Sequence, residues 1–251
     1  MLARARLYLR DLGNEATVIV CFGSALLIIS HHQAGTGYFR EVFGSTYDKH
    51  PAIGALTHFY WFGASFFLYC IMPLLIAVAT RGSFHRNYGF GLGDWRAGLK
   101  ISALFLAIML PSAYVASKMA AFKGMYPLAG SAAYTLHVDG RPDIISWKLF
   151  LVYELGYVFY FVGWEFFFRG WMLNGLLPKM GRLGALLVPI APFAVMHLGK
   201  AEIEALGSII AGLALGILAL RTRSFWYGVM IHGTVAVFMD WLSARSYLLR
   251  P

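Results

Sequence analysis

The sequence predicts an all-α fold, a polytopic transmembrane bundle of about seven helices. The chain has 251 residues, of which 59% are hydrophobic and 13% charged, a more apolar mixture than that of soluble globular proteins. Its apolar residues are also grouped into runs near ~20 residues, the length that crosses a bilayer core. The formal net charge of +9 is spread between these runs, without the basic cluster of a nucleic-acid-binding protein. We therefore expect membrane lipids, and no nucleic acid, among its partners.

The spans follow from the apolar runs along the chain. The first run follows Arg4, Arg6 and Arg10 without a small-residue cleavage site, so we interpret it as an uncleaved span and not as a signal peptide. The first and fifth runs are short, which fixes the number of spans to within one. The predicted spans are Ala16–Ser30, Ala52–Thr80, Leu99–Ser117, Trp147–Leu177, Gly184–Leu198, Ile203–Leu220 and Ser224–Leu242.

The orientation follows from the loops, because Lys and Arg are enriched on the cytoplasmic side. A cytoplasmic N-terminus places most of the basic loops on that side. These loops hold Arg4, Arg6, Arg10, Arg81, Arg86, Arg96, Lys100, Lys179, Arg182, Arg221 and Arg223. The sequence thus predicts an integral plasma-membrane protein with its N-terminus in the cytoplasm.

One membrane domain accounts for the whole chain, since no repeat, low-complexity tract or long linker divides it. Within that domain we distinguish N-terminal spans and loops, residues 1–145, from core helices, residues 146–244. The glycine-rich stretch Asn87–Asp94 lacks the strand and helix of a phosphate-binding loop, so we interpret it as a flexible connector. Ser208, Gly212 and Gly216 recur every four residues, which predicts a face for close helix packing.

Ionisable groups inside the predicted spans are concentrated after residue 150, and such groups are costly in a membrane unless they are paired or functional. The earlier spans contribute His58, which we interpret as a hydrogen-bonded or interfacial histidine. The later spans contribute Glu154, Glu165, Arg169, His197, His232 and Asp240. This concentration predicts a buried polar site in the C-terminal part of the chain.

The spacing brings some of these groups together. Glu165 and Arg169 are four residues apart, which places them on one helical face in the favourable order for an ion pair. Glu165 and His197 lie at equal separations from the turn expected at Pro178–Gly184, about 20 Å along each helix, so they should share one depth. His232 should lie several ångströms from that depth, a gap that helix tilt can close.

A carboxylate with two histidines in a dehydrated cavity suits activation of water or ligation of zinc. These helices have no His-x-x-x-His pattern and no cysteine pair that would secure a tetrahedral metal site. We therefore expect no cofactor, with zinc on the same side chains as the alternative.

Three segments carry a resemblance to a known family. The run from Glu165 to Gly170 resembles the end of a Glu-Glu-x-x-x-Arg motif, and Phe193-Ala-Val-Met-His197 matches a Phe-x-x-x-His motif. The segment from Arg221 through His232 is similar to a helix with a His-x-x-x-Asn pattern. In this order and spacing the motifs resemble those of the CAAX-protease and bacteriocin-processing intramembrane endopeptidases, over about residues 150–242.

The resemblance implies hydrolysis of a peptide bond in a membrane-associated protein or peptide, with a lipidated, CAAX-like tail as one form. By analogy, Glu165 and His197 activate water, His232 stabilises the oxyanion, and Arg169 holds Glu165 ionised. Two positions depart from the family: Trp164 replaces the first glutamate, which usually serves as base, and Ala236 replaces the asparagine.

Several alternatives remain open on the sequence. Glu165 and Arg169 can be a structural ion pair, and Glu154 can be a second acid or base, although we expect both Glu154 and Asp240 at the bilayer interface. Tyr153, Tyr157 and Tyr160 form a helical stripe that suits packing, while one phenol could replace the missing asparagine. The alternative functions are an inactive relative that binds membrane partners, as in immunity or sorting, and a transporter with carboxylate proton sites.

Overall fold

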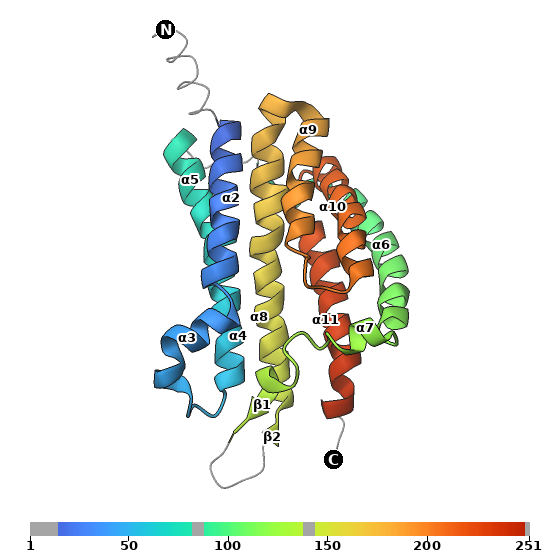
Figure 1. Ribbon diagram of the computed structural model, residues 1–251. Coiled ribbons are helices and arrows are strands. Elements are labelled where there is room, and N and C mark those ends of the chain that lie inside the picture. Colours follow the sequence, from blue (N-terminus) through green and yellow to red (C-terminus); the bar gives the residue numbers. More distant parts are fainter. Residues whose placement is uncertain (1–14, 82–87, 138–143, 249–251) are drawn as a thin grey trace.

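The computed structural model describes residues 15–81, 88–137 and 144–248, and it confirms the helical bundle (Figure 1). Within these residues the sheet consists of two short antiparallel strands, β1 and β2, which join through Thr135 and Ile145. The elements are α2 (Glu15–Gln33), α3 (Thr36–Tyr47), α4 (Ile53–Phe66), η1 (Phe67–Ile71), α5 (Met72–Arg81), α6 (Trp95–Ala116), α7 (Ala120–Lys123), η3 (Ala132–Tyr134), β1 (Thr135–Leu136), β2 (Ile144–Ile145), α8 (Trp147–Glu165), η4 (Phe166–Met172), α9 (Leu173–Val195), α10 (Glu202–Thr222) and α11 (Trp226–Leu248).

The helices follow the predicted spans closely. Five helical runs among the described residues are long and apolar enough to cross a membrane. Four of them match the first, second, third and sixth predicted spans. The predicted fourth and fifth spans form one helical run, Trp147–Val195, which folds back at Gly181, where φ is 64° and ψ is −178°. That backbone conformation favours glycine, and it confirms the expected turn between Pro178 and Gly184. The predicted seventh span corresponds to α11.

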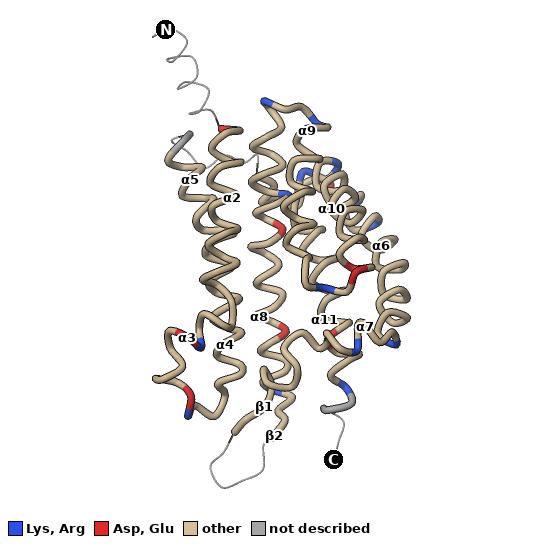
Figure 2. Tube along the Cα trace, viewed as in Figure 1, with Lys and Arg blue, Asp and Glu red and all other residues tan. Residues whose placement is uncertain are grey.

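The outer surface of the bundle is apolar. On α10 the side chain of Ile210 is 74% exposed, and on α8 that of Leu155 is 71% exposed. Figure 2 shows few charged positions along the long helices and more of them near the connections, apart from acidic positions within α8. A soluble protein rarely exposes so much continuous apolar surface, so this arrangement supports burial in lipid.

The central element is α8 with its continuation η4. It packs against α4, α9 and α11 (Figure 1). The segment η4 is a π-helix, and all of its residues are buried. Such segments are rare and are frequent at functional sites. Asn174, one turn further on, donates its side-chain amide to the carbonyls of Arg169 (2.9 Å) and Gly170 (2.8 Å), and so satisfies acceptors within this wide turn.

The glycine-rich stretch before α6, interpreted from the sequence as a flexible connector, is instead anchored over its described residues, 88–94. The indole of Trp226 donates to the carbonyl of Phe90 (2.9 Å), and the hydroxyl of Tyr227 donates to that of Leu92 (2.7 Å). Both donors lie at the start of α11. The prediction was wrong because the partners of these carbonyls lie more than a hundred residues away in the chain, where local composition gives no signal.

We predict that Gly93→Ala destabilises this anchor. Gly93 has φ +54°, and a Cβ atom there would overlap the carbonyl of Thr222. The strain should lower the free energy of unfolding by about 1–3 kcal/mol. Thermal unfolding in detergent measures the change. Gly91→Ala is the matched control, because a Cβ atom at Gly91 would make only an ordinary contact, 4.0 Å from the backbone nitrogen of Gly93. Equal melting temperatures for the two variants would contradict the anchor.

Candidate active site

Glu165 lies at the centre of the candidate site, as the last residue of α8 before the π-helical turn. Its side chain has no solvent exposure. One oxygen, Oε1, accepts hydrogen bonds from Nη1 of Arg169 (3.0 Å) and from Nδ1 of His232 (2.9 Å). The ion pair between Glu165 and Arg169 confirms the sequence prediction. His232 joins this pair from another helix, α11.

Arg169 supplies the counter-charge of the buried carboxylate. Its side chain is only 4% exposed, and its guanidinium carbon lies 4.1 Å from the centre of the Phe193 ring. A guanidinium over an aromatic face gains cation–π attraction, which offsets part of the cost of removing the charge from water. The ion pair and the stacked ring together hold the carboxylate in one orientation.

His232 is the member of this group that reaches the surroundings, with 22% of its side chain exposed. Its ring lies 4.3 Å from that of Phe161, centre to centre. A carboxylate accepts hydrogen bonds, so the neutral ring carries its proton on Nδ1, and the lone pair is on Nε2. The ring nitrogen that is not bonded to Glu165 thus keeps its lone pair. The depth gap expected between His232 and Glu165 is closed in the structure.

His197 lies beside this group without a hydrogen bond to Glu165 among the described contacts. Its Nδ1 donates to the carbonyl of Phe193 at 2.7 Å. A carbonyl can only accept, so Nε2 of the neutral ring again carries the lone pair. The His197 and His232 rings are 6.4 Å apart, centre to centre, and nearly parallel, with an interplanar angle of 14°. The two imidazoles thus lie side by side, each with the lone pair of its neutral ring on Nε2.

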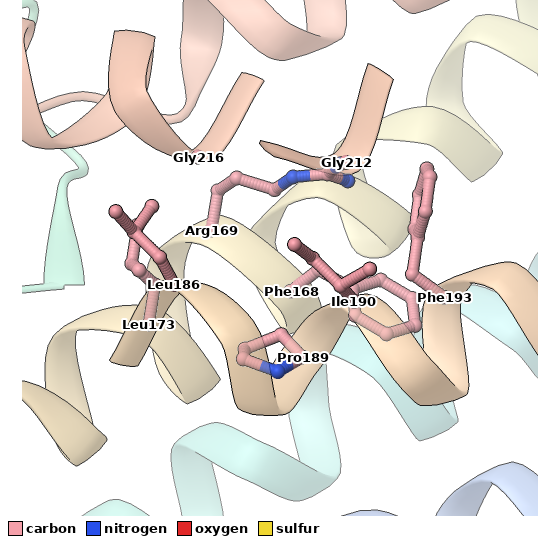
Figure 3. Close-up of a pocket in the computed structure, with 9 residues that line it drawn as sticks. All are labelled: Phe168, Arg169, Leu173, Leu186, Pro189, Ile190, Phe193, Gly212 and Gly216. Atoms are coloured by element: carbon pink, nitrogen blue, oxygen red, sulfur yellow. The ribbon is translucent and has the colours of Figure 1, made fainter. Parts of the chain in front are cut away.

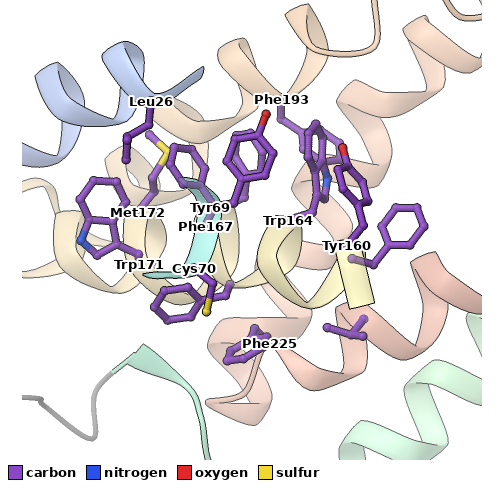
Figure 4. Close-up of a cluster of buried hydrophobic side chains, with 14 of the residues drawn as sticks. Leu26, Tyr69, Cys70, Tyr160, Trp164, Phe167, Trp171, Met172, Phe193 and Phe225 are labelled. Atoms are coloured by element: carbon purple, nitrogen blue, oxygen red, sulfur yellow. The ribbon is translucent and has the colours of Figure 1, made fainter. Parts of the chain in front are cut away.

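Trp164 fills the place next to His197. Its ring meets that of His197 edge-on at 5.9 Å and lies 5.7 Å from that of Phe193. Figure 4 shows the indole among the buried aromatic side chains, close to Phe193 and Tyr160. The residue that replaces the family's first glutamate is therefore an apolar wall of the histidine pair. Ala236, one turn beyond His232, is partly buried in the same core and has no hydrogen-bonding side chain.

A close helix contact holds His232 against Glu165. Gly228 lies one turn before His232 on α11, and a Cβ atom there would overlap Oε2 of Glu165. The sequence reasoning did not identify Gly228 or Asn174 as parts of the site. For Gly228, the four-residue spacing to His232 was a signal that could have identified it, because residues so spaced share a helical face.

The small-residue face of α10 packs behind Arg169, as predicted. A Cβ atom at Gly212 would lie 3.2 Å from the Phe193 ring, and one at Gly216 would lie 2.8 Å from Leu186. Between α9 and α10 a cavity of about 10 Å³ borders Arg169, and Figure 3 shows this side chain extending toward α10. That volume suits one water molecule and is too small for a peptide.

Glu154 and Asp240, expected at the bilayer interface, are buried inside the protein, with 6% and 0% exposure. Both helices extend beyond these residues and pack against each other, and the depth of the two side chains in the bilayer stays a prediction. The tyrosine stripe on α8 packs on α4, where the Phe62 ring lies 5.5 Å from that of Tyr157. His58 is buried, and its Nδ1 donates to the carbonyl of Gly54 at 2.7 Å.

Zinc on these side chains is the alternative that the sequence left open. Among the residues that the structure describes, no group of three or more His, Cys, Asp or Glu side chains is arranged to hold a metal ion. In addition, Oε1 of Glu165 is already bonded to the guanidinium of Arg169, and this positive charge would repel a metal cation. A tetrahedral zinc site needs three or four converging ligands.

Comparison with known proteins finds a family match for the C-terminal part of the chain. Residues 146–238 match the family described as type II CAAX prenyl endopeptidase, Rce1-like. The match confirms the resemblance drawn from the motifs and includes Glu165, Arg169, His197 and His232. Neither the curated proteins nor the solved structures give a match to the chain.

We predict that Gly228→Ala separates α11 from Glu165 and weakens the contact with His232. Overpacking at a tight site costs about 1–3 kcal/mol, which lowers the melting temperature by roughly 2–10 °C. Gly233→Ala on the same helix is the control, because a Cβ atom there makes ordinary contact with Val158 at 3.6 Å. A Gly228→Ala protein as stable as this control would show that the close contact is not required.

Proposed function

We propose that the protein is an intramembrane endopeptidase in which a Glu165–His232 dyad activates water. The observation that carries the proposal is the buried carboxylate bonded to both Arg169 and His232, with His197 beside them. These residues lie within residues 146–238, the part of the chain that matches the Rce1-like family. We thus propose for this chain the type of reaction that the family's description names, cleavage by an endopeptidase.

The contacts support a distribution of roles different from the one drawn from the resemblance. Oε1 of Glu165 is occupied by two donors, and Oε2 has no hydrogen-bond partner. Because the whole side chain has no exposure, direct proton transfer from water to this carboxylate is disfavoured. His232 is partly exposed and has a basic Nε2. We therefore assign the role of general base to His232, and Glu165 orients its ring and stabilises the imidazolium form.

In the first step a water molecule gives one hydrogen bond to each histidine Nε2. Its oxygen attacks the carbonyl carbon of the peptide bond while His232 takes one proton. The protonated ring then lies beside the new oxyanion and stabilises it electrostatically, a role that the Ala236 methyl group cannot fulfil. In the second step the carbon–nitrogen bond breaks, and His232 returns the proton to the departing amine. The products are a carboxylic acid and an amine, and the dyad is regenerated.

The substrate class follows from the surroundings of the site. The dyad lies among apolar helices, so the peptide must itself enter the membrane or be held there. We propose a membrane-associated protein or peptide, including one with a lipidated, CAAX-like tail. We further propose that the protein is in the plasma membrane with a cytoplasmic N-terminus, on the grounds of its loop charges.

A second candidate function is that of an inactive relative which binds membrane proteins without cleaving them. Trp164 favours this alternative, because its indole fills the place beside His197 where the family has its first glutamate. Ala236 favours it as well, because it lacks the amide of the family's asparagine. In this alternative the Glu165–Arg169 pair only stabilises the bundle.

We predict that Glu165→Gln lowers turnover by ~10²-fold or more with little change in thermal stability. Gln keeps the size of the side chain but removes the charge that supports the imidazolium. Cleavage of a prenylated CAAX peptide, and of the same peptide without its lipid, by the purified protein in detergent measures the effect. His232→Gln should show a loss of similar size, and the double variant should lose little more than His232→Gln alone, because the two residues act as a unit.

The matched control is His32→Gln, at an exposed position at the end of α2. Full turnover in a folded Glu165→Gln protein would contradict the mechanism. If the wild-type protein binds these peptides but cleaves neither, the second candidate function is correct. A parallel assay with a chelator tests the zinc alternative: we expect unchanged turnover, and loss that added zinc restores would favour the metal.

A further inference from the structure

A second buried polar cluster lies on α8, away from the candidate active site. Glu154 precedes Glu165 by eleven residues, about 16 Å along the helix. Asp240 lies on α11, eight residues beyond His232. Both side chains are almost fully buried, with 6% and 0% exposure. The α8–α11 contact therefore carries the Glu165–His232 pair at one level and two carboxyl groups at another.

Partly exposed polar groups lie near this cluster. Lys200 donates from Nζ to the hydroxyl of Tyr126 (3.1 Å), and this hydroxyl donates to Oε1 of Glu204 (2.7 Å). The backbone N–H of Leu128 donates to Oδ1 of Asp240 at 3.1 Å. Lys200, Tyr126 and Glu204 are partly exposed, and Lys200 and Glu204 interact electrostatically with the buried Asp240.

The deepest polar atoms of the cluster have no hydrogen-bond partner. They are both carboxyl oxygens of Glu154, Oδ2 of Asp240 and the hydroxyl of Tyr153. Tyr153 is 0% exposed, and it interacts electrostatically with Asp240 and with Glu154. Buried polar groups are nearly always paired. Four unpaired atoms at one place point to a bound species.

The charges indicate the sign of that species. Asp240 interacts electrostatically with Glu154 and with Lys200, and Lys200 also interacts with Glu204. The acidic side chains therefore outnumber the lysine, and Glu154 has no cation bonded to it. An uncompensated carboxylate in an apolar interior costs several kcal/mol. A positive charge between Glu154 and Asp240 would remove this cost.

We propose that Glu154 and Asp240, with the hydroxyl of Tyr153, form a buried site that binds one positive charge, either a proton or a small monovalent cation. The described residues offer no group of three or more acidic, histidine or cysteine ligands that could hold a metal ion, so a tightly ligated divalent ion does not suit the site. The site is separate from the proposed catalytic dyad. Its occupant stabilises the α8–α11 contact by removing the repulsion between the two carboxylates.

Thermal unfolding as a function of pH and of the cation tests the proposal. In choline chloride the melting temperature of the wild-type protein should fall by several degrees between about pH 5 and about pH 9, because loss of the proton leaves two buried negative charges. Glu154→Gln and Asp240→Asn remove one charge each and keep the shape of the side chain. Each variant should remain folded and flatten this dependence, and the double variant should abolish it.

Sodium chloride in place of choline chloride distinguishes the two occupants. Recovery of the melting temperature at high pH identifies the monovalent cation. A protonated-carboxyl infrared band that Glu154→Gln or Asp240→Asn removes identifies the proton. The proposal is overturned if the double variant follows the wild-type protein at every pH in both salts.

Other titratable groups face the cluster and require controls. They are Lys200, Tyr126, Glu204 and Tyr153, together with Tyr134, which interacts with Tyr153, and His58, whose ring lies 5.6 Å from that of Tyr153. His58→Gln and Glu204→Gln should keep the wild-type pH dependence, as should Glu202→Gln at an exposed position. If the pH dependence of the melting temperature is flattened in His58→Gln or Glu204→Gln but not in Glu154→Gln, then His58 or Glu204 causes that dependence. This result would contradict the proposed site.

Discussion

The rest of the site depends on the burial of one carboxylate, that of Glu165. A carboxylate without solvent exposure is stable only with a counter-charge and hydrogen-bond donors. Arg169 provides the charge from the next turn, and His232 provides a donor from another helix. To bring that helix close enough, α11 has a glycine at position 228. The need to compensate one charge therefore fixes the approach of α11 to α8.

The aromatic surroundings make these polar contacts stronger. Phe161 and Phe193 cover the imidazole and the guanidinium, and Trp164 closes the side toward His197. In such a low-dielectric setting a hydrogen-bonded pair interacts more strongly than in water. The same helix carries Glu154, whose oxygens have no hydrogen-bond partner. Arg169 thus compensates the charge of Glu165 within the protein. The carboxyl group of Glu154 instead requires a bound proton or cation.

The sequence predicted the features that depend on neighbouring residues. Apolar run length placed the helices, and the spacing around Pro178 and Gly184 placed the turn that Gly181 makes. Glu165, Arg169, His197 and His232 could be selected as candidates because each motif is a short pattern within one segment of the sequence. Their grouping followed only in part, since the spacing gave equal depth for Glu165 and His197 but left His232 several ångströms away.

Other features depend on packing between distant segments and could not be predicted. The interior position of Asp240 follows from its contact with the segment at Leu128, which is more than a hundred residues earlier. The π-helical turn after Glu165 has no clear signature in Phe166–Met172. The partial exposure of His232 and the full burial of Glu165 were likewise set by the tertiary arrangement.

The central claim is that Glu165 fixes the proton of His232 on Nδ1 and leaves Nε2 basic. Nitrogen-15 NMR of histidine-labelled protein tests it most directly, with the His232 signal assigned by its loss in His232→Gln. At a pH where the ring is neutral, we expect a protonated Nδ1 and an unprotonated Nε2. A ring protonated on Nε2, with the lone pair of Nδ1 toward Glu165, would contradict the proposed role of Glu165.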